Sequence, residues 1–118
     1  MTLLKKFISF FLKKTIDGLI VSNTTIGRPD TLVCKNKLES GGLSGNPLKN
    51  LSNEVTQRMF ELTQGKITII GVGGIENGQD ALEKIKCGAS LIQIYTSMVY
   101  EGFPIVDKIK RELAFLLE

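Results

Sequence analysis

Hydrophobic and polar positions follow two different spacings along the chain. Three short stretches are almost continuously apolar and rich in β-branched residues, as is typical of parallel strands buried on both faces: residues 19–21, 67–70 and 91–95. Elsewhere the apolar residues recur every three or four positions, which indicates helices. The predicted order is helix, strand, long loop, helix, strand, helix, strand, helix. This order defines an α/β protein built from successive βα units of a parallel sheet.

The predicted helices have recognisable ends and inward stripes. In the second helix, Ser52 is the expected N-cap, and Gly65 follows as the stop. Its expected inward stripe is Val55, Met59 and Leu62. The third helix is expected to begin at the cap Asn77, with Asp80 three residues on, and to end at Gly88. Its expected inward residues are Ala81, Leu82 and Ile85. The last helix is expected to have Pro104 in its first turn and an inward stripe of Ile105, Ile109, Leu113 and Leu116.

Residues 1–14, MTLLKKFISFFLKK, predict an amphipathic basic helix. Its broad apolar face holds Leu3, Leu4, Phe7, Ile8, Phe10, Phe11 and Leu12, and its opposite face holds Lys5, Lys6, Ser9 and Lys13. Early lysines and the lack of a small-residue cleavage site argue against a signal peptide. Two interpretations stay open: a helix that lies on a membrane surface, and a helix that covers a sheet with its lysines in water. We favour the second.

Composition narrows the chemistry. A chain of 118 residues fits one small domain, and a net charge of +3 is too small to predict a nucleic-acid partner. The chain has no histidine, and Cys34 and Cys87 do not have a metal-binding spacing, so we expect no metal site and no histidine-activated nucleophile. Two unpaired cysteines suit a reducing cytoplasm. The predicted location is therefore cytoplasmic, and peripheral contact with the inner face of a membrane is left open.

The strand ends carry the candidate chemistry, because ligands of α/β folds bind at the carboxyl ends of the strands. Small hydrogen-bonding side chains at 22–25 follow the first strand, the glycine-rich residues 71–75 follow the second, and residues 95–97 end the third. The long connection 26–51 contains the glycines of 41–45, a pattern typical of a binding loop. Glycines beside a helix N-terminus favour a phosphate dianion. Ordinary tight turns explain these glycines equally well.

Chain length limits the architecture. A (β/α)8 barrel takes about 250 residues. Three strands cannot close a barrel. The chain is therefore either a small open α/β sheet or the last part of a barrel whose first part lies elsewhere.

Five motifs taken together resemble the C-terminal part of class 2, quinone-dependent, dihydroorotate dehydrogenase. They are residues 17–25 (DGLIVSNTT), 41–48 (GGLSGNPL), 69–75 (IIGVGGI), 78–85 (GQDALEKI) and 88–96 (GASLIQIYT). The resemblance covers residues 10–118, and 109–117 (IKRELAFLL) is similar to the family's last barrel helix. It implies the C-terminal three βα units of a (β/α)8 TIM barrel, incomplete as an isolated chain. Residues 1–14 would then be a remnant of a barrel helix, and residues 15–118 the C-terminal part of an FMN-binding barrel.

The resemblance also implies a site. Members of the family use FMN to oxidise dihydroorotate to orotate in de novo pyrimidine biosynthesis, and class 2 passes the electrons to a membrane quinone. At the matching positions, FMN would contact Ser22, Ser44, Gly45, Gly73, Gly74, Tyr95 and Thr96, the last four at its phosphate. Asn23 and Thr24 would hold the pyrimidine substrate against the flavin.

The family's catalytic groups lie upstream of the matching region: its serine base, the lysine beside the flavin and the quinone-channel helices. Cys34, Ser40 and Ser97 offer nucleophilic or basic atoms but do not match that base, so no catalytic residue is assigned. Three hypotheses stay open. The chain is part of the enzyme, inactive unless a separate polypeptide supplies the first half of the barrel; or a non-catalytic phosphate- or flavin-binding half-barrel; or a non-functional remnant. The exposed edge of such a sheet predicts marginal stability and self-association.

Overall fold

Helices alternate with strands along the chain in the order that the sequence predicts. The computed structural model describes residues 2–14 and 16–118; Met1 and Thr15, which begin the two predicted parts of the chain, lie outside the described residues. The helices are α1 (Leu3–Lys13), α2 (Lys49–Thr63), α3 (Gly78–Lys86), α4 (Thr96–Glu101) and α5 (Pro104–Leu117), with the 3₁₀ helices η1 (Lys35–Leu38) and η2 (Asn46–Leu48). The sequence analysis did not predict α4, η1 or η2.

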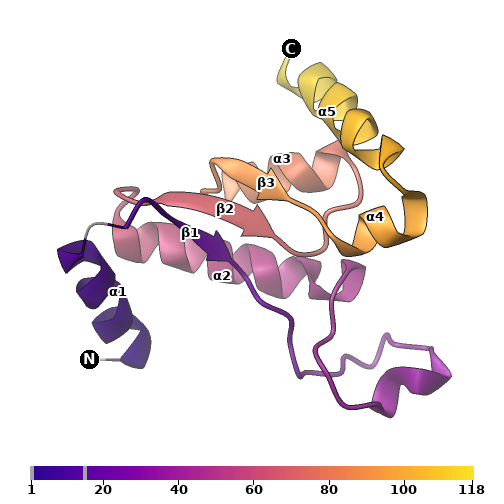
Figure 1. Cartoon of the computed structure of the whole chain (residues 1–118), viewed down its shortest axis with the longest axis horizontal. Coiled ribbons are helices and arrows are strands. Elements are labelled where there is room, and N and C mark those ends of the chain that lie inside the picture. The colour runs from indigo at the N-terminus through magenta and orange to yellow at the C-terminus, as the bar shows by residue number, and fades with distance from the viewer. Residues whose placement is uncertain (1, 15) are drawn as a thin grey trace.

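The three predicted strands form one parallel sheet in the order β1-β2-β3 (Figure 1). They are β1 (Gly18–Val21), β2 (Thr68–Val72) and β3 (Leu91–Gln93). In the register of the sheet, Val21 lies opposite Gly71, and Gly71 lies opposite Ile92. The carboxyl ends of all three strands therefore meet at one edge of the sheet, as the sequence predicts.

One face of this sheet packs against helices, and the other is open. Val21 and Ile69 belong to the core cluster on the covered face, and the partly buried Leu19 packs against it. On the opposite face Ile20 is 63% exposed and Leu91 is 57% exposed. The prediction of strands buried on both faces is therefore wrong for this chain, because none of the described residues forms a layer over the second face.

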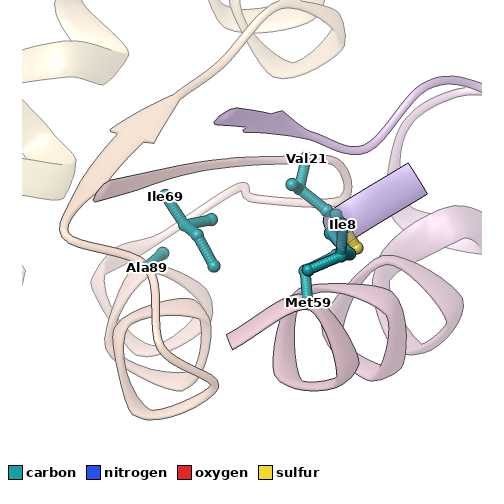
Figure 2. Packing of buried hydrophobic residues seen from close by; sticks show 5 residues of the cluster. All are labelled: Ile8, Val21, Met59, Ile69 and Ala89. Carbon is teal, nitrogen blue, oxygen red and sulfur yellow. The ribbon is translucent and has the colours of Figure 1, made fainter. Parts of the chain in front are cut away.

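Helix α1 contributes to the core through one residue. Figure 2 shows the cluster that it joins, formed by Ile8, Val21, Met59, Ile69 and Ala89. Most of the predicted apolar face lies in solvent, since Leu3, Phe7 and Phe10 are exposed. Among the described residues, no helix has both the length and the apolar character needed to cross a membrane.

Helix α2 packs on the sheet with a face of small polar residues. It begins at Lys49, so Ser52 is not the N-cap but a fully buried residue of the second turn. Thr56 and Thr63 are also fully buried, and each hydroxyl donates to a main-chain carbonyl of the same helix. The predicted cap is wrong, and Val55 of the predicted stripe is exposed, because hydroxyls bonded within the helix can be buried at little cost.

Helix α3 begins where the sequence predicts. Asn77 Oδ1 accepts a hydrogen bond of 2.9 Å from the Asp80 N–H, as an N-cap does. Ala81 is fully buried, as predicted. Leu82 and Ile85 are only half-buried, and the second fully buried side chain of this helix is Lys84, which the hydrophobic pattern does not predict.

Helix α5 follows its predicted stripe for two turns. Ile105 and Ile109 are buried in a second core cluster together with Ile75 and Ala81. Leu116, the last residue of the predicted stripe, is exposed, because the final turn extends beyond the residues it would pack on.

The molecule is flat. Its Cα radius of gyration is 15.3 Å and its extents are 42 × 41 × 20 Å. A compact domain of this length has a radius of gyration of about 13–14 Å. The excess arises from a sheet with one open face and from a long loop that extends away from it, the segment between β1 and α2 in Figure 1. The fold thus has the proportions of one side of a barrel.

Candidate functional site

A pocket of about 200 Å³ lies at the carboxyl ends of the three strands. All nine site residues nominated from the sequence line it: Ser22, Asn23, Thr24, Ser44, Gly45, Gly73, Gly74, Tyr95 and Thr96. They come from the end of β1, the long loop, the turn after β2 and the segment after β3. The fold therefore gathers into one place residues that are far apart in the sequence.

Backbone pairing holds the long loop beside the end of β1. Thr25 and Leu43 exchange two main-chain hydrogen bonds of 3.1 and 2.7 Å. Gly42 lies so close to Thr24 that a Cβ would overlap the threonine side chain. Asn23 Oδ1 accepts a hydrogen bond of 2.7 Å from the Thr24 N–H. These contacts fix the two proposed substrate residues, Asn23 and Thr24, at the rim of the pocket.

One arginine organises the long loop. The Arg28 guanidinium donates hydrogen bonds of 2.7–3.1 Å to the main-chain carbonyls of Ile26, Gly27, Lys37, Glu39 and Gly41. A connection that looks structureless in the sequence is thus tied together by a single side chain. The planar guanidinium, with five N–H donors, suits this role.

The loop also reaches the end of β3. Thr96 Oγ1 donates a hydrogen bond of 2.8 Å to Ser44 Oγ. A Cβ on Gly45, whose φ is 79°, would lie 3.0 Å from Thr96 Cγ2. Glycine at this position lets the backbone of the loop approach Thr96 closely.

The turn after β2 forms the floor of the pocket. The Val72 carbonyl accepts two hydrogen bonds, one of 3.1 Å from the Ser22 N–H and one of 2.7 Å from Ser52 Oγ. Gly73 and Gly74 follow with φ values of 122° and 70°. A Cβ on Gly73 would lie 2.8 Å from Ser52 Oγ, and one on Gly74 would lie 2.5 Å from the backbone of α2. Only glycine fits here, for reasons of both backbone angle and space.

The start of α3 carries a small network of charges. Asp80 Oδ2 accepts a 3.0 Å hydrogen bond from the Glu76 N–H, and Asp80 Oδ1 forms a 3.1 Å ion pair with Lys49 Nζ. The hydrogen bond to Asp80 raises the pKa of Lys49. Glu76 lines the pocket and accepts a 2.9 Å hydrogen bond from Asn46 Nδ2. Each carboxylate near the pocket thus already has a donor partner.

A second lysine is buried behind the pocket. Lys84 is 0% exposed, and its ammonium donates a hydrogen bond of 2.7 Å to Ser52 Oγ. Its stem lies against Gly71, where a Cβ would overlap it. Burial removes the ammonium from water and thereby lowers the pKa of Lys84 to about 8.

One further residue of the pocket, Ser97, has no assigned ligand contact from the sequence. Ser97 Oγ lines the pocket, is buried, and has no hydrogen-bond partner among the described residues. The sequence places Ser97 at the end of the third strand beside the candidate phosphate site, but no ligand contact was assigned to it; in the structure it lies in the first turn of α4. Cys34 and Ser40, which offer nucleophilic or basic atoms, line a separate hollow of the long loop.

The three parallel strands have helices on one face and a pocket at their carboxyl ends, which is the arrangement along one side of a (β/α)-barrel protein. The sequence model of the family described as dihydroorotate dehydrogenase matches residues 4–117. The chain belongs to the dihydroorotate dehydrogenase family. This confirms the resemblance read from the five motifs.

Individual relatives agree with this assignment. The mitochondrial dihydroorotate dehydrogenase (quinone) of Mus musculus is 55% identical over 103 residues, which make up 87% of this chain and 26% of the mouse protein. The dihydroorotate dehydrogenase (quinone) of Rhodospirillum rubrum is 52% identical over 99 residues, or 84% of this chain and 27% of that protein. The crystal structure of ligand-free DHODH from Eimeria tenella matches with a TM-score of 0.93 at 43% identity, covering 99% of this chain and 33% of that chain.

These matches have two consequences. The fold is a three-stranded piece of a TIM barrel, as predicted. The chain spans about a quarter of the length of the curated relatives it matches.

Proposed function

We propose that the chain forms the phosphate side of an FMN site in a quinone-dependent dihydroorotate dehydrogenase and that it is inactive alone. The pocket carries this proposal, because all nine residues nominated from the motifs line it. The carboxyl ends of barrel strands are also where barrel enzymes bind phosphate groups. Family membership supports the oxidation of dihydroorotate to orotate, in de novo pyrimidine biosynthesis, as the activity of the whole protein.

The residues of the pocket fit a phosphate group. Gly73 and Gly74 have left-handed φ angles, and a Cβ on either would collide with residues 48–52, so glycine is what lets this turn pack against the start of α2. Successive main-chain N–H groups in such a turn, here in the lining of the pocket, can form a concave site for an anion. The buried hydroxyl of Ser97 has no hydrogen-bond partner among the described residues and is available to donate to a phosphate oxygen. We propose that these groups, with Tyr95 and Thr96, hold the phosphate.

The other half of the pocket would hold the flavin and the substrate. When bound, FMN supplies the redox centre that takes hydride from the substrate. Ser22, Ser44 and Gly45 are proposed to contact the flavin. Because Asn23 Oδ1 already accepts a hydrogen bond from Thr24, the Nδ2 group of Asn23 is the one that would donate to a pyrimidine carbonyl. Asn23 and Thr24 would thereby orient the substrate.

The remaining catalytic groups are proposed to come from the part of the barrel that the relatives have beyond this match. In one arrangement a separate polypeptide supplies that part. The open face of the sheet supports this, because exposed Ile20 and Leu91 would be buried by further strands. A quinone as electron acceptor is proposed for the whole protein, and the support for it is that the relatives are named as quinone-dependent enzymes.

Flavin binding is the first test. The purified chain is titrated with FMN, and binding is followed by flavin fluorescence. We expect binding that weakens about tenfold in Ser44→Ala and Thr96→Val, because each removes one partner of the Ser44–Thr96 hydrogen bond. Ser90→Ala, an exposed serine outside the pocket, is the matched control. Bulky variants of Gly73 and Gly74 are unsuitable, because they would collide with α2 whether or not flavin binds.

A chain that shows no change of flavin fluorescence at high FMN concentration would contradict the proposal and favour the non-functional remnant. Activity is measured separately as dihydroorotate-dependent reduction of a dye. We expect no turnover from the chain alone, and turnover alone would show that the proposed division of the catalytic groups is wrong.

Self-association is the second candidate, favoured by the open sheet face and by the outer edges of β1 and β3, which pair with no other strand among the described residues. In this case the chain is a flavin-binding half-barrel that buries the face of Ile20 and Leu91 against a second copy. Light scattering would then give a dimer that retains flavin without turnover. Ile20→Glu would return that dimer to a monomer, and a wild-type monomer would exclude this candidate.

The cellular location stays a prediction. The cytoplasm, with peripheral contact at the inner face of a membrane, was proposed from composition and from the first helix. Exposed Phe7 and Phe10 beside the lysines of α1 support the membrane contact. The mouse relative is named as mitochondrial, which describes that protein.

A further inference from the structure

Lys84 lies directly behind the residues that line the pocket. Its side chain passes under Gly71 and ends at Ser52, to whose Oγ the ammonium donates a hydrogen bond of 2.7 Å. Ser52 Oγ in turn donates a hydrogen bond of 2.7 Å to the Val72 carbonyl, and Val72 lines the pocket. A chain of two short hydrogen bonds therefore links a buried ammonium to the pocket floor.

The same hydroxyl also supports the glycine turn. A Cβ on Gly73 would lie 2.8 Å from Ser52 Oγ, so this hydroxyl lies against the backbone of Gly73. Only the hydroxyl of Ser52 separates the ammonium from two residues that line the pocket, Val72 and Gly73.

The charges around Lys84 compensate its ammonium only in part. Burial lowers the pKa of Lys84, and the nearby Cys87 and Asp80 counteract this more weakly. Asp80 itself is ion-paired with Lys49 of α2 at 3.1 Å. The packed sheet side contributes the neutral Gly71 and Ala89. An ammonium has three N–H donors, yet Ser52 Oγ is its one acceptor among the described residues.

We infer that Lys84 is a positioning residue for the binding of a phosphate monoester. It acts through Ser52 to hold the glycine turn, and it supplies positive charge behind that turn. This inference rests on the proposed function and extends it to a residue that does not touch the ligand. A charge in a dry interior acts on the pocket with little screening by solvent. Burying it without a counterion is costly, and a bound anion offsets part of that cost.

The protonation of Lys84 gives this role a measurable signature. Burial lowers the pKa of Lys84 to about 8, so its side chain is positively charged at neutral pH and loses this charge as the pH rises past 8. A phosphate monoester is a dianion throughout that range, because its second pKa is about 6. Affinity for the anion should therefore fall above about pH 8, while a ligand without phosphate is unaffected.

The test compares the full chain with Lys84→Met, which keeps a long apolar side chain and removes the charge. Lys66→Met, at an exposed lysine beside the amino end of β2, is the control for the loss of one positive charge. FMN and riboflavin, which lacks the phosphate, are titrated from pH 6.5 to 9 by fluorescence. Circular dichroism verifies the fold of each variant.

We expect Lys84→Met to weaken FMN binding about tenfold at pH 7, to leave riboflavin binding unchanged, and to remove the loss of FMN affinity above pH 8. Equal FMN affinity and an unchanged pH profile in Lys84→Met would overturn the inference while the proposed function stands. Equal loss of FMN and riboflavin would show a purely structural role and overturn it as well. A wild-type chain that does not bind FMN would overturn the proposed function and this inference together.

Discussion

Two regions contribute residues to the pocket and are held in different ways. The first, called the wall, is the packed layer of β2 with the turn after it, α2 and α3, where Ile69, Thr56 and Lys84 are almost fully buried behind the pocket. The second is the long loop 26–45, where Val33 is 97% exposed and Arg28 holds the backbone through main-chain carbonyls. Buried contacts hold the wall, whereas hydrogen bonds to one side chain hold the loop.

The comparison teaches where the stability of this chain resides. Regions with few buried apolar contacts open locally at low free energy, while buried elements open only with the whole fold. The loop supplies Ser44 and Gly45 to the pocket, and the wall supplies Gly73 and Gly74. Half of the pocket is thus expected to be rigid, and the other half to open independently.

The largest expected effect comes from filling space in the wall. Gly71→Val would place a Cβ within 2.9 Å of Ala89 and into the stem of Lys84. We expect it to lower the free energy of unfolding by about 3 kcal/mol, measured by urea denaturation. In the loop, the Cβ of Gly41→Ala would have no atom within 4 Å, so the only cost is the strained φ of 128°. We expect this variant to lower the free energy of unfolding by about 1 kcal/mol. Equal losses would show that the loop is as tightly packed as the wall.

The next effect is the pH dependence caused by Lys84. The pKa of Lys84 is lowered from 10.5 to about 8 in the folded chain, so the unfolded chain binds more protons between these values. The contribution of Lys84 to the free energy of unfolding therefore rises between about pH 8 and about pH 10.5, by at most about 3 kcal/mol. Urea denaturation of the wild type and of Lys84→Met across this range isolates the effect. Parallel curves for the two proteins would contradict the burial of a charged Lys84.

Release of the loop should affect its dynamics more than global stability. Arg28→Ala removes the donor shared by the carbonyls of Lys37, Glu39 and Gly41. We expect amide hydrogen exchange in residues 26–45 to accelerate at least tenfold, while the free energy of unfolding changes by about 1 kcal/mol or less. Arg28→Lys keeps the charge but not the planar fork, and should behave like Arg28→Ala. Faster exchange throughout β2 would mean that the loop and the wall open together.

The smallest effects concern one cap in each region. Asn77→Ala removes the N-cap of α3 and should cost about 1 kcal/mol, with Asn77→Ser recovering most of it. Cys34→Ala removes the weak 3.5 Å acceptor at the start of η1 and should change stability by less than about 0.5 kcal/mol. Thermal unfolding of the three variants tests this order. An equal shift of the unfolding temperature in both alanine variants would show that the cap in the wall and the cap in the loop contribute equally to stability.

Local patterns were enough to predict the sheet and much of the pocket. The three apolar runs became strands, and Asn77 caps α3, because both depend on residues close in sequence. Gly73 and Gly74 were also identified from local sequence, since glycines at a strand end before a helix already indicate close backbone approach.

Contacts between distant residues were not predictable in this way. Ser52 was predicted as an N-cap, and the hydrophobic pattern does not place Lys84 in the core. Both are fully buried, and they are joined by a hydrogen bond across 32 positions of sequence. Arg28 looks like an ordinary surface charge until the loop folds around it. The open face of the sheet was misread because apolar strands show a need for burial but not which residues satisfy it.

The Val72 carbonyl determines the polarity that the pocket presents to a ligand. A carbonyl oxygen has two lone pairs, and both of these accept hydrogen bonds, from Ser22 and Ser52. The negative end of this dipole is thereby satisfied within the protein and repels an entering anion less. A ligand that brings its own donors consequently finds no free acceptor at this carbonyl, whereas a ligand rich in acceptors needs none there. Selection between the two kinds of ligand therefore begins at a main-chain carbonyl that the protein itself has saturated.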